Sequence, residues 1–561
     1  MAKKRIALGL DFGTESGRVI LVDVQTGEEL ATVVKNYPHG VMDTVLPDGK
    51  TALPPDWALQ DPMDYVTVTQ DIVPEALRQA GVSAEQIVGI GVDFTSCTIL
   101  PTLADGRPLC TLEEFQSEPH AYVKLWKHHA AQPEADEINM LAEKRGEPFL
   151  KRYGGKISSE WLFPKALQIL HEAPAVYERA EKIIEAGDWL VWQLTGNERR
   201  SACQAGYKAL WSKSEGYPSE DFFGALDPRF AKIVDEKLSR TIYPVGALAG
   251  GLTAAMAEAL SLKEGTPVGV GIIDAHAALL GSSVAEPAKM VLVLGTSTCH
   301  MVLGEKNIPA EGIAGIVEDG IVPGLVAYES GQSAVGDIFA WFMKSSVPTE
   351  YQEAAQKAGL DLYKWMEKKA AEGKAGQSGL LALDWWNGNR SVLMDATLLG
   401  LMVGMTLATK PEEIYRALIE ATAFGTRKII QTHEEQGVPV TELYACGGLA
   451  EKNELLLQIY ADVTGREIRV ADSQQAAALG AAIIGAIAAG KERGGYDDFK
   501  EATQKMARLK DVVYRPNPEN KEIYDRLYEK YIQLHDYFGL SERGFMRELR
   551  QIKLKTLGIA E

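Results

Sequence analysis

Two turns in the sequence combine glycine with hydroxyl side chains directly after an apolar stretch. The first turn contains Gly13, Thr14 and Ser16, and the second contains Gly295 and Thr296. Glycine lets phosphate oxygens approach backbone N–H groups closely, and a nearby hydroxyl adds another donor. A single turn of this kind could be an ordinary hairpin. Two of them, in separate halves of the chain, indicate two loops that hold one polyphosphate from opposite sides of a cleft.

An acidic residue, Asp11, lies two positions before Gly13. A carboxylate beside a phosphate loop suits Mg²⁺, which is usually held through water because magnesium loses its water shell reluctantly. We therefore expect Asp11 to hold the metal of a Mg²⁺-ATP complex. The alternative is a solvated acid in a plain turn.

A third nucleotide element is expected at residues 443–453. An apolar strand ends there in Gly447 and Gly448, and Asn453 lies in the first turn of the helix that follows. A glycine pair at the end of a strand leaves room for a flat adenine ring against the backbone. The amide of Asn453 could then hydrogen-bond the nucleotide. An ordinary strand-to-helix loop is the alternative.

The elements around these turns predict a mixed α/β fold. Strands, a helix and a further strand are expected in the order 6–10, 18–24, 30–36, 62–80 (the helix) and 87–92. The apolar residues 291–294 and the turn that follows them repeat the opening of the chain. We therefore expect two copies of one nucleotide-binding module.

The length of 561 residues predicts two large domains, because single domains seldom exceed about 250 to 300 residues. Glycine-rich sequence near residue 246 marks the expected boundary, ahead of a single strand at residues 268–273. The expected domains are residues 1–245 and residues 246–500, followed by a helical extension at residues 501–561 that packs on them.

The composition excludes several classes of protein. Hydrophobic residues make up 46% and charged residues 24% of the chain, as in an average soluble globular protein. The net charge of −19, without any Lys/Arg-rich run, argues against nucleic acid as a partner. The apolar residues 476–490 are too few to span a membrane and are expected as a buried helix. The five cysteines lack disulfide or metal spacing. We expect a cytoplasmic protein without membrane contact.

These motifs resemble the FGGY family of carbohydrate kinases. Residues 400–405, followed by residues 413–420, are similar to the C-terminal signature of that family. The N-terminal signature is weaker at residues 163–168, since Gln168 stands where many relatives have Trp. The resemblance extends over residues 11–490. It implies two actin-like, ribonuclease H-like domains flanking a catalytic cleft, with ATP and Mg²⁺ as cofactors.

The resemblance also assigns a catalytic base. Phosphorylation of a hydroxyl needs a carboxylate that accepts its proton as the γ-phosphoryl group transfers. Asp274 follows the apolar residues 270–273 in a Gly-x-x-Asp-x-x-Ala pattern similar to the one that carries this base in the family. We therefore expect Asp274 to be the base, beside the sugar at the cleft edge of the second domain. An aspartate at a strand end is otherwise a helix cap.

Sugar contacts are expected from both domains. The residues that resemble the family's sugar-binding positions, besides Asp274, are Ser96, Trp126, Lys208 and Glu329. Trp126 would stack on the sugar, and the polar side chains would bond its hydroxyls. Taken singly, each could be an ordinary core or surface residue. A Met-His-Gly turn typical of xylulose kinases is absent after the strand at residues 87–92, which argues against xylulose.

The function expected from the resemblance is phosphorylation of a ketopentose, with L-ribulose converted to L-ribulose 5-phosphate in arabinose catabolism as the favoured reaction. D-ribulose, ribitol, xylulose and glycerol remain alternative acceptors, because fold and phosphate loops do not determine the sugar. An actin-like or chaperone-like ATPase is the rival from another class. The small-molecule sugar is the expected partner, and a homodimer is left open.

Overall fold

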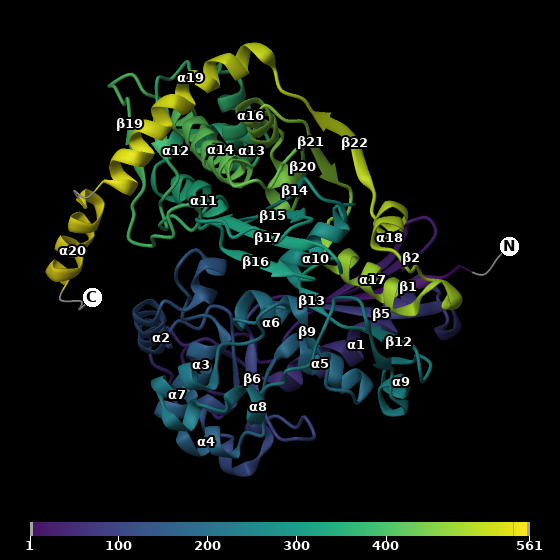
Figure 1. The fold of residues 1–561 in the computed structure, drawn as a ribbon. Coiled ribbons are helices and arrows are strands. Elements are labelled where there is room, and N and C mark those ends of the chain that lie inside the picture. Colours follow the sequence, from purple (N-terminus) through teal and green to yellow (C-terminus); the bar gives the residue numbers. More distant parts are fainter. Residues whose placement is uncertain (1–3, 542–543, 558–561) are drawn as a thin grey trace.

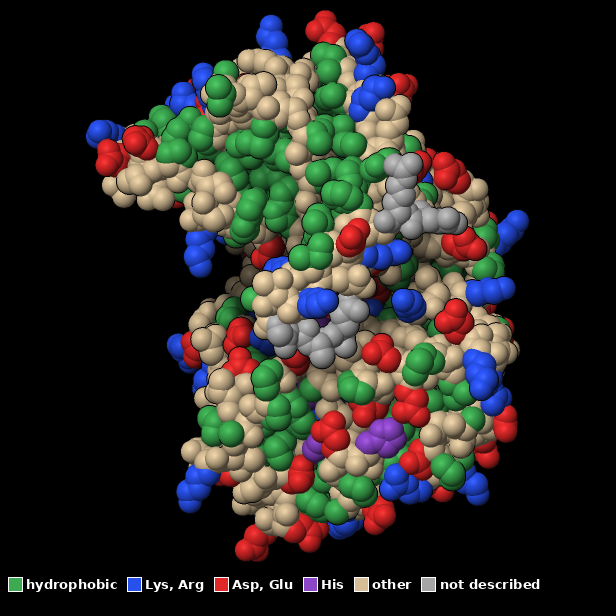
Figure 2. Space-filling model, turned by 90° about the vertical axis from the view of Figure 1, so that its left-hand side faces the viewer, with side chains coloured by type: hydrophobic (Ala, Val, Ile, Leu, Met, Phe, Trp, Pro, Cys, Tyr) green, Lys and Arg blue, Asp and Glu red, His purple; other side chains and the backbone are tan. Residues whose placement is uncertain are grey.

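The computed structural model describes residues 4–541 and 544–557, and every structural statement below refers to these residues. They form two lobes, each built on a seven-stranded sheet. The first half of the chain makes the lower lobe of Figure 1, and the second half makes most of the upper one. The space-filling view shows a hollow between the two lobes on one side (Figure 2).

The first sheet has the strand order β11-β12-β5-β1-β2-β3, and β13 also pairs with β5. Its strands are β1 Ile6–Phe12, β2 Ser16–Asp23, β3 Glu29–Asn36, β5 Ile87–Phe94, β11 Leu248–Gly251, β12 Pro267–Gly269 and β13 Ile272–Ile273. Strands β1, β2 and β3 are antiparallel, whereas β5 is parallel to β1, β12 and β13.

The second sheet has the order β16-β17-β15-β14-β20-β21-β22. Its strands are β14 Lys289–Leu294, β15 Thr298–Gly304, β16 Gly315–Glu318, β17 Val326–Gln332, β20 Glu442–Cys446, β21 Ile468–Ala471 and β22 Leu509–Tyr514. Strands β14, β15 and β17 are antiparallel, and β20 is parallel to both β14 and β21.

The two sheets share one topology. The path β3-β2-β1-β5-β12 of the first has the same strand directions as β17-β15-β14-β20-β21 of the second. The predicted α/β fold and the predicted repeat of one module are therefore confirmed. Each hairpin that carries a predicted phosphate loop, β1–β2 or β14–β15, occupies the same place in its sheet.

The first sheet continues beyond the domain boundary expected near residue 246. Strands β11, β12 and β13 all follow that residue, yet they join the first sheet through β5. The single strand expected at residues 268–273 is divided into β12 and β13. Asp274, expected in the second domain, consequently follows a strand of the first sheet.

Two helices, α10 Asp274–Gly281 and α17 Ala476–Ala489, lie between the sheets (Figure 1). Their glycines permit backbone contact: a Cβ on Gly480 would lie 1.9 Å from the carbonyl oxygen of Ala277. A Cβ on Gly91 of β5 would lie equally close, 1.9 Å, to the carbonyl oxygen of Ala481. The apolar stretch at residues 476–490 is thus a buried helix, as predicted, and it ties the second half of the chain to the first sheet.

The remaining helices cover the sheets. In the first lobe they are α1 Pro62–Ala80, α2 Gln132–Arg145, α3 Leu162–Glu172, α4 Pro174–Arg179, α5 Ala186–Thr195, α6 Ala202–Lys208, α7 Glu220–Leu226, α8 Ile233–Lys237 and α9 Ala254–Leu260. In the second lobe they are α11 Gly336–Ser345, α12 Thr349–Lys357, α13 Leu362–Ala371, α14 Pro411–Glu435, α15 Gly448–Lys452 and α16 Glu454–Thr464, with α18 Phe499–Met506 packed on α17. Small sheets are formed by β4 Leu59–Gln60, β6 Ile99–Thr102, β7 Val123–Lys124 and β8 Lys182–Glu185, by β9 Arg200–Ser201 with β10 Ile242–Tyr243, and by β18 Leu381–Leu383 with β19 Leu401–Val403.

The C-terminal segment departs in one respect from the helical extension expected at residues 501–561. Strand β22 pairs with β21 and forms the edge of the second sheet. Helix α19 Pro518–His535 then buries its tyrosines in the core of the second lobe. Helix α20 Phe545–Leu557 follows along the outside (Figure 1). Over the described ranges, no helix has the length and apolar character needed to cross a membrane.

Candidate active site

Three aspartates gather at one edge of the first sheet. Asp11 lies opposite Asp93 in the parallel pair β1–β5. On the other side of β5, Ile272 of β13 lies beside Asp93, and Asp274 follows β13 as the first residue of α10. Because these three strands are parallel, their carboxyl ends meet at the same edge, where α/β proteins place their ligands.

Burial acts on the first two of these carboxyl groups, and repulsion by neighbouring acids adds to it at Asp93. Asp93 is fully buried, and neither of its side-chain oxygens has a hydrogen-bond partner among the described residues. Burial, followed by the charges of Asp11 and Asp274, raises the pKa of Asp93 well above its ordinary value. Burial also raises the pKa of Asp11, opposed by the guanidinium of Arg18, which lies 3.5 Å from the Asp11 carboxylate.

Asp274 has the properties of a base near neutral pH. Burial, then the charge of Asp11, raises the pKa of Asp274 to about 7, although a hydrogen bond of 2.6 Å from the backbone N–H of Ala275 opposes the shift. Glu329 raises this pKa further, so the sugar side of the proposed site influences Asp274 electrostatically. Ile273, not Asp274, occupies the cap position of α10. Because its carboxylate accepts a backbone N–H of the first turn, Asp274 also stabilises the start of α10.

The first predicted phosphate loop is a tight turn held from several sides. The backbone N–H of Gly13 donates to the carbonyl oxygen of Ser16 at 3.0 Å. Behind the turn, the Tyr37 hydroxyl donates to the Gly13 carbonyl at 2.8 Å, and Gln60 Nε2 donates to the Thr14 carbonyl at 2.7 Å. These bonds leave the Thr14 side chain partly exposed. The loop is thus rigid before any ligand binds.

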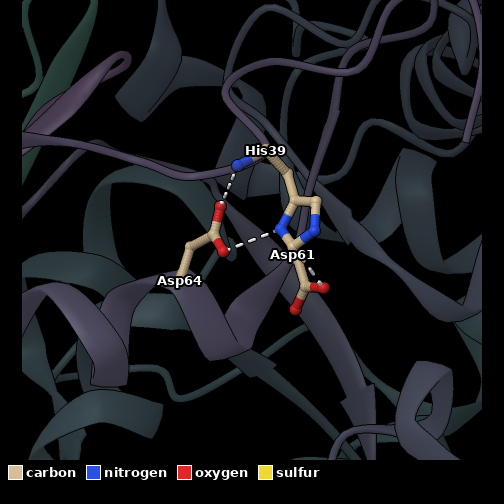
Figure 3. Close-up of side chains that lie close together, drawn as sticks. All are labelled: His39, Asp61 and Asp64. Carbon is tan, nitrogen blue, oxygen red and sulfur yellow. Dashed lines mark hydrogen bonds and ion pairs between the residues drawn. The ribbon is translucent and has the colours of Figure 1, made fainter. Parts of the chain in front are cut away.

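Behind the same loop lies a cluster of His39, Asp61 and Asp64 (Figure 3), whose donor atoms are close enough together to hold a metal ion. These atoms already form hydrogen bonds. His39 Nδ1 lies 2.8 Å from Asp64, whose other oxygen accepts the His39 backbone N–H at 2.9 Å. Asp61 caps α1 by accepting the backbone N–H of Met63 at 2.9 Å. The cluster therefore fixes the start of α1 behind the phosphate loop.

The second predicted phosphate loop is also a tight turn, one residue shorter than the first. The backbone N–H of Gly295 donates to the Ser297 carbonyl at 3.0 Å. The N-terminus of α11 supports it, since the N–H of Gly336 donates to Gly295 at 3.1 Å and that of Val335 to Thr296 at 2.8 Å. Thr296 itself is exposed. Both predicted loops are therefore turns with a hydroxyl-bearing residue at the surface.

The predicted adenosine element lies beside the second loop. Gly447 has φ of 92°, and a Cβ there would lie 2.5 Å from the Leu294 carbonyl, so only glycine fits. Gly448 is exposed, and a Cβ there would meet nothing within 4 Å. The side chain of Asn453 is held by structural contacts, because its Oδ1 caps α16 and its Nδ2 donates to the Tyr415 hydroxyl at 3.1 Å. The amide predicted to contact nucleotide is thus engaged within the protein.

Lys208 and Glu329, both predicted to bind the sugar, meet across the two lobes. Lys208, at the end of α6, places Nζ 3.5 Å from Glu329 Oε2 in β17. The same oxygen lies 3.3 Å from His276 Nε2, and Arg390 Nη2 bonds the other oxygen, Oε1. Glu329 is 3% exposed, so its charge is balanced inside the protein. Lys208 and Arg390 accordingly hold the pKa of Glu329 well below its usual range, against the effect of burial.

Ser96 and Trp126 lie on two loops joined by one lysine. Lys165 of α3, fully buried, donates to the carbonyl of Cys97 at 2.7 Å and also to that of Leu125. Trp126 is 38% exposed, which excludes an ordinary core position, and its Nε1 donates to Thr14 Oγ1 at 3.0 Å. The expected sugar wall therefore adjoins the first phosphate loop.

Sequence reasoning missed two charged residues of this region. Asp93 ends a strand next to the strand of Asp11, and an acid at the end of an apolar strand was a signal that could have identified it. Arg390 lies in an irregular loop, 61 residues after Glu329, and no motif marks it. The structure brings Asp274, Lys208 and Glu329 together, whereas Asn453 is turned to internal contacts.

Models of the FGGY family of carbohydrate kinases match most of the chain. The N-terminal domain of that family matches residues 6–281, and the C-terminal domain matches residues 290–489. A ribulokinase of Geobacillus thermodenitrificans is 55% identical over 98% of this chain and 97% of its own length. A ribulokinase of Mycolicibacterium smegmatis is 48% identical over 98% of this chain and 96% of its own.

Solved structures show the same fold. A xylulose kinase of Rhodospirillum rubrum superposes with a TM-score of 0.78 at 24% identity, covering 95% of this chain and 99% of that one. A xylulose kinase of Lactobacillus acidophilus, also at a TM-score of 0.78, is 19% identical and covers 96% of this chain and all of that one, 100%. Two domain models and full-length relatives agree: this chain belongs to the FGGY family of carbohydrate kinases.

Proposed function

We propose that this protein is an ATP-dependent ribulokinase that converts L-ribulose to L-ribulose 5-phosphate. The observation that carries the proposal is Asp274, whose pKa of about 7 suits a general base, between the phosphate-loop side of the first sheet and the Lys208–Glu329 pair. The ribulokinases that match nearly the whole chain support ribulose as the acceptor.

In this mechanism the sugar lies between the lobes, with its reacting hydroxyl at the Asp274 carboxylate. The hydroxyl oxygen forms a bond to the γ-phosphorus while the bond from that phosphorus to the bridging oxygen breaks, and ADP leaves. The hydroxyl proton passes to the Asp274 carboxylate. Ser96, Lys208 and Glu329 bind the remaining hydroxyls, and Trp126 stacks against the sugar. Catalysis comes from the positioning of the two substrates and from compensation of the charge on the transferring phosphoryl group.

The nucleotide is assigned to the two turns and the glycine pair. Gly13, Thr14 and Ser16 bind the phosphates from the first lobe, and Gly295 and Thr296 bind them from the second. Adenosine then lies over Gly447 and Gly448, where the surface beside Gly448 is open. Asn453 contributes to this site by capping the helix below it.

The donor chemistry fits a magnesium ion at the first loop. Asp11 and Asp93 lie side by side, both supply oxygen only, and the oxygens of Asp93 lack hydrogen-bond partners within the described ranges. Asp11 would hold the ion, mainly through water, and the bound ion would neutralise charge on the ATP phosphates. Arg18, 3.5 Å from Asp11, balances this carboxylate from the protein side. Use of free sugar and ATP agrees with a cytoplasmic enzyme.

The test is ADP release, measured in a coupled assay, across L-ribulose, D-ribulose, xylulose, ribitol and glycerol. We expect L-ribulose to give the highest kcat/KM and ATP turnover without sugar to be far slower. A higher kcat/KM for another acceptor would change the assigned substrate. Fast turnover that no sugar alters would support an actin-like ATPase instead. The same assay with Mg²⁺ removed by chelation should show no sugar phosphorylation.

A further inference from the structure

We propose that Arg390 is a positioning residue of the sugar site, which fixes the Glu329 carboxylate and thereby sets the affinity for the acceptor. The inference rests on the proposed function, because it takes Glu329 to bind a sugar hydroxyl. Arg390 comes from the irregular loop between β18 and β19 and carries no expected role.

The two oxygens of Glu329 have different partners. Oε1 is bonded by Arg390 Nη2, whereas Oε2 lies 3.5 Å from Lys208 Nζ and 3.3 Å from His276 Nε2. Glu329 is 3% exposed, so its charge depends mainly on these protein partners. Without Arg390, the buried Glu329 carboxylate would lose the cation that pairs with Oε1. The carboxylate would then rotate or bind a proton. Either change alters the group that meets the sugar.

The backbone holds Arg390 firmly beside the strand of Glu329. The N–H of Ser391 donates to the Gly331 carbonyl at 3.1 Å, and the N–H of Gly331 donates to Ser391 Oγ at 3.1 Å. Gly331 also makes room, because a Cβ there would lie 3.2 Å from Arg390 Cδ. This reciprocal pairing fixes where the Arg390 side chain leaves its loop, two residues along β17 from Glu329.

The loop itself is closed at its base and tied to the C-terminal helix. Asn389 and Asp395 exchange backbone hydrogen bonds of 2.9 and 2.8 Å. From α20, Arg547 Nη2 pairs with the Asp395 carboxylate at 2.6 Å, and Arg550 Nη1 donates to the Ala396 carbonyl at 2.8 Å. Helix α20, otherwise at the edge of the second lobe, thus supports the loop that positions Arg390.

An arginine suits this role better than a lysine. Its guanidinium stays charged at any working pH and is planar, so the N–H groups along one edge can bond a carboxylate while the stem packs on Gly331. Arg390 bonds Glu329 and also interacts with Cys299 of β15, and within the described ranges neither partner belongs to the predicted phosphate loops. The effect of Arg390 should therefore appear in sugar binding and leave ATP binding unchanged.

The experiment compares Arg390→Ala and Arg390→Lys with the wild type in steady-state assays that vary sugar and ATP separately. For Arg390→Ala we expect the KM for L-ribulose to rise roughly hundredfold, as when a buried charge pair is broken, with the KM for ATP within about twofold. Arg390→Lys should recover part of the loss. Arg466→Ala is the matched control, because Arg466 likewise pairs with one glutamate, Glu434, outside the cleft. It should behave as wild type.

A second measurement distinguishes the positioning of Glu329 by Arg390 from a general contribution of Arg390 to the fold. In a Glu329→Gln background, Arg390→Ala should raise the KM for L-ribulose little further, because the negative charge that Arg390 pairs with is already absent. An equal loss in both backgrounds, an unchanged KM for sugar in a folded Arg390→Ala protein, or equal rises for ATP and sugar would overturn the inference. If Arg390→Ala does not fold, an Arg390→Lys protein with normal sugar affinity overturns it as well. A wild type that phosphorylates no ketopentose contradicts the proposed function. The role of Arg390 is then still tested by comparing the binding of L-ribulose to wild type and Arg390→Ala in a thermal-shift assay.

Discussion

The two sheets carry the same hairpin in the same place but differ in the residues just before the glycine turn. In the first sheet, Asp11 lies two positions before Gly13 and opposite Asp93. In the second, Val293 lies two positions before Gly295, and Cys446 is its neighbour. The duplicated fold therefore contains both predicted phosphate loops, whereas the acidic pair is present in the first sheet alone among these equivalent positions.

This difference indicates a division of roles between the lobes. In the proposed function, the first sheet supplies the acids for metal binding and proton transfer, and β13 adds Asp274 to the same edge. The second sheet has a neutral loop and the glycine pair beside it, and it carries Glu329, the proposed sugar ligand. Changes in the first sheet should therefore affect chemistry, while the equivalent changes in the second should affect binding or stability.

The largest effect is expected at Asp274. Asp274→Asn removes the proton acceptor and should lower kcat by about 10² to 10⁴, while sugar and ATP still bind. Steady-state kinetics with calorimetry of sugar binding checks both parts. Asp361→Asn is the control, because Asp361 caps α13 and is not placed to accept the proton of the sugar hydroxyl. Near-normal turnover in a folded Asp274→Asn protein would mean that the base has to be sought elsewhere.

The second comparison sets Asp11 against its neutral counterpart. Asp11→Asn should weaken Mg²⁺-dependent activity by roughly ten- to a hundredfold, as when metal-orienting groups are lost, and leave sugar affinity unchanged. Val293→Ala, at the equivalent position, should change activity little. Titration of Mg²⁺ at fixed ATP measures the first effect. Similar losses in both variants would contradict the division of roles between the sheets.

Secondary structure was predictable from the sequence where it depends on residues close together in the chain. Helix α1 has the predicted bounds of residues 62–80, and β1 extends the strand expected at residues 6–10 by two residues. The glycine turns were recognisable because their chemistry lies within a few residues. The attachment of β12 and β13 was not, since a strand pattern does not reveal which sheet the strand joins.

The same limit applies to the contacts among the predicted site residues. Lys208 and Glu329 were identified by resemblance, but their contact across the lobes depends on the packing of α6 against the second sheet. Arg390 needed the fold of an irregular loop, and the capping bond of Asn453 needed its backbone position in three dimensions. Contacts between distant segments depend on tertiary geometry, which residue types at a given spacing do not report.

The third prediction concerns pH. The pKa of Asp274 is raised to about 7, so the carboxylate that accepts a proton predominates only above that pH. The value of kcat/KM for the sugar should rise with pH up to about 7 and fall roughly tenfold for each unit below it. A pH profile measured at saturating Mg²⁺-ATP checks this. An identical acidic limb in the residual activity of Asp274→Asn would assign the limb to another group.

The smallest effects are expected at the glycine pair of the second lobe, where two adjacent substitutions distinguish fold from ligand. Gly447→Ala should reduce the free energy of unfolding by about 1 to 3 kcal/mol. A residue with a side chain is strained at the Gly447 φ of 92°, and the alanine Cβ would lie 2.5 Å from the Leu294 carbonyl oxygen. Gly448→Ala should leave stability unchanged, since a Cβ there meets nothing within 4 Å. If adenosine lies over this glycine, the added methyl group raises the KM for ATP and not that for sugar. Denaturant unfolding and kinetics of both variants measure these effects, and an unchanged KM for ATP in Gly448→Ala would move the adenosine site away from the pair.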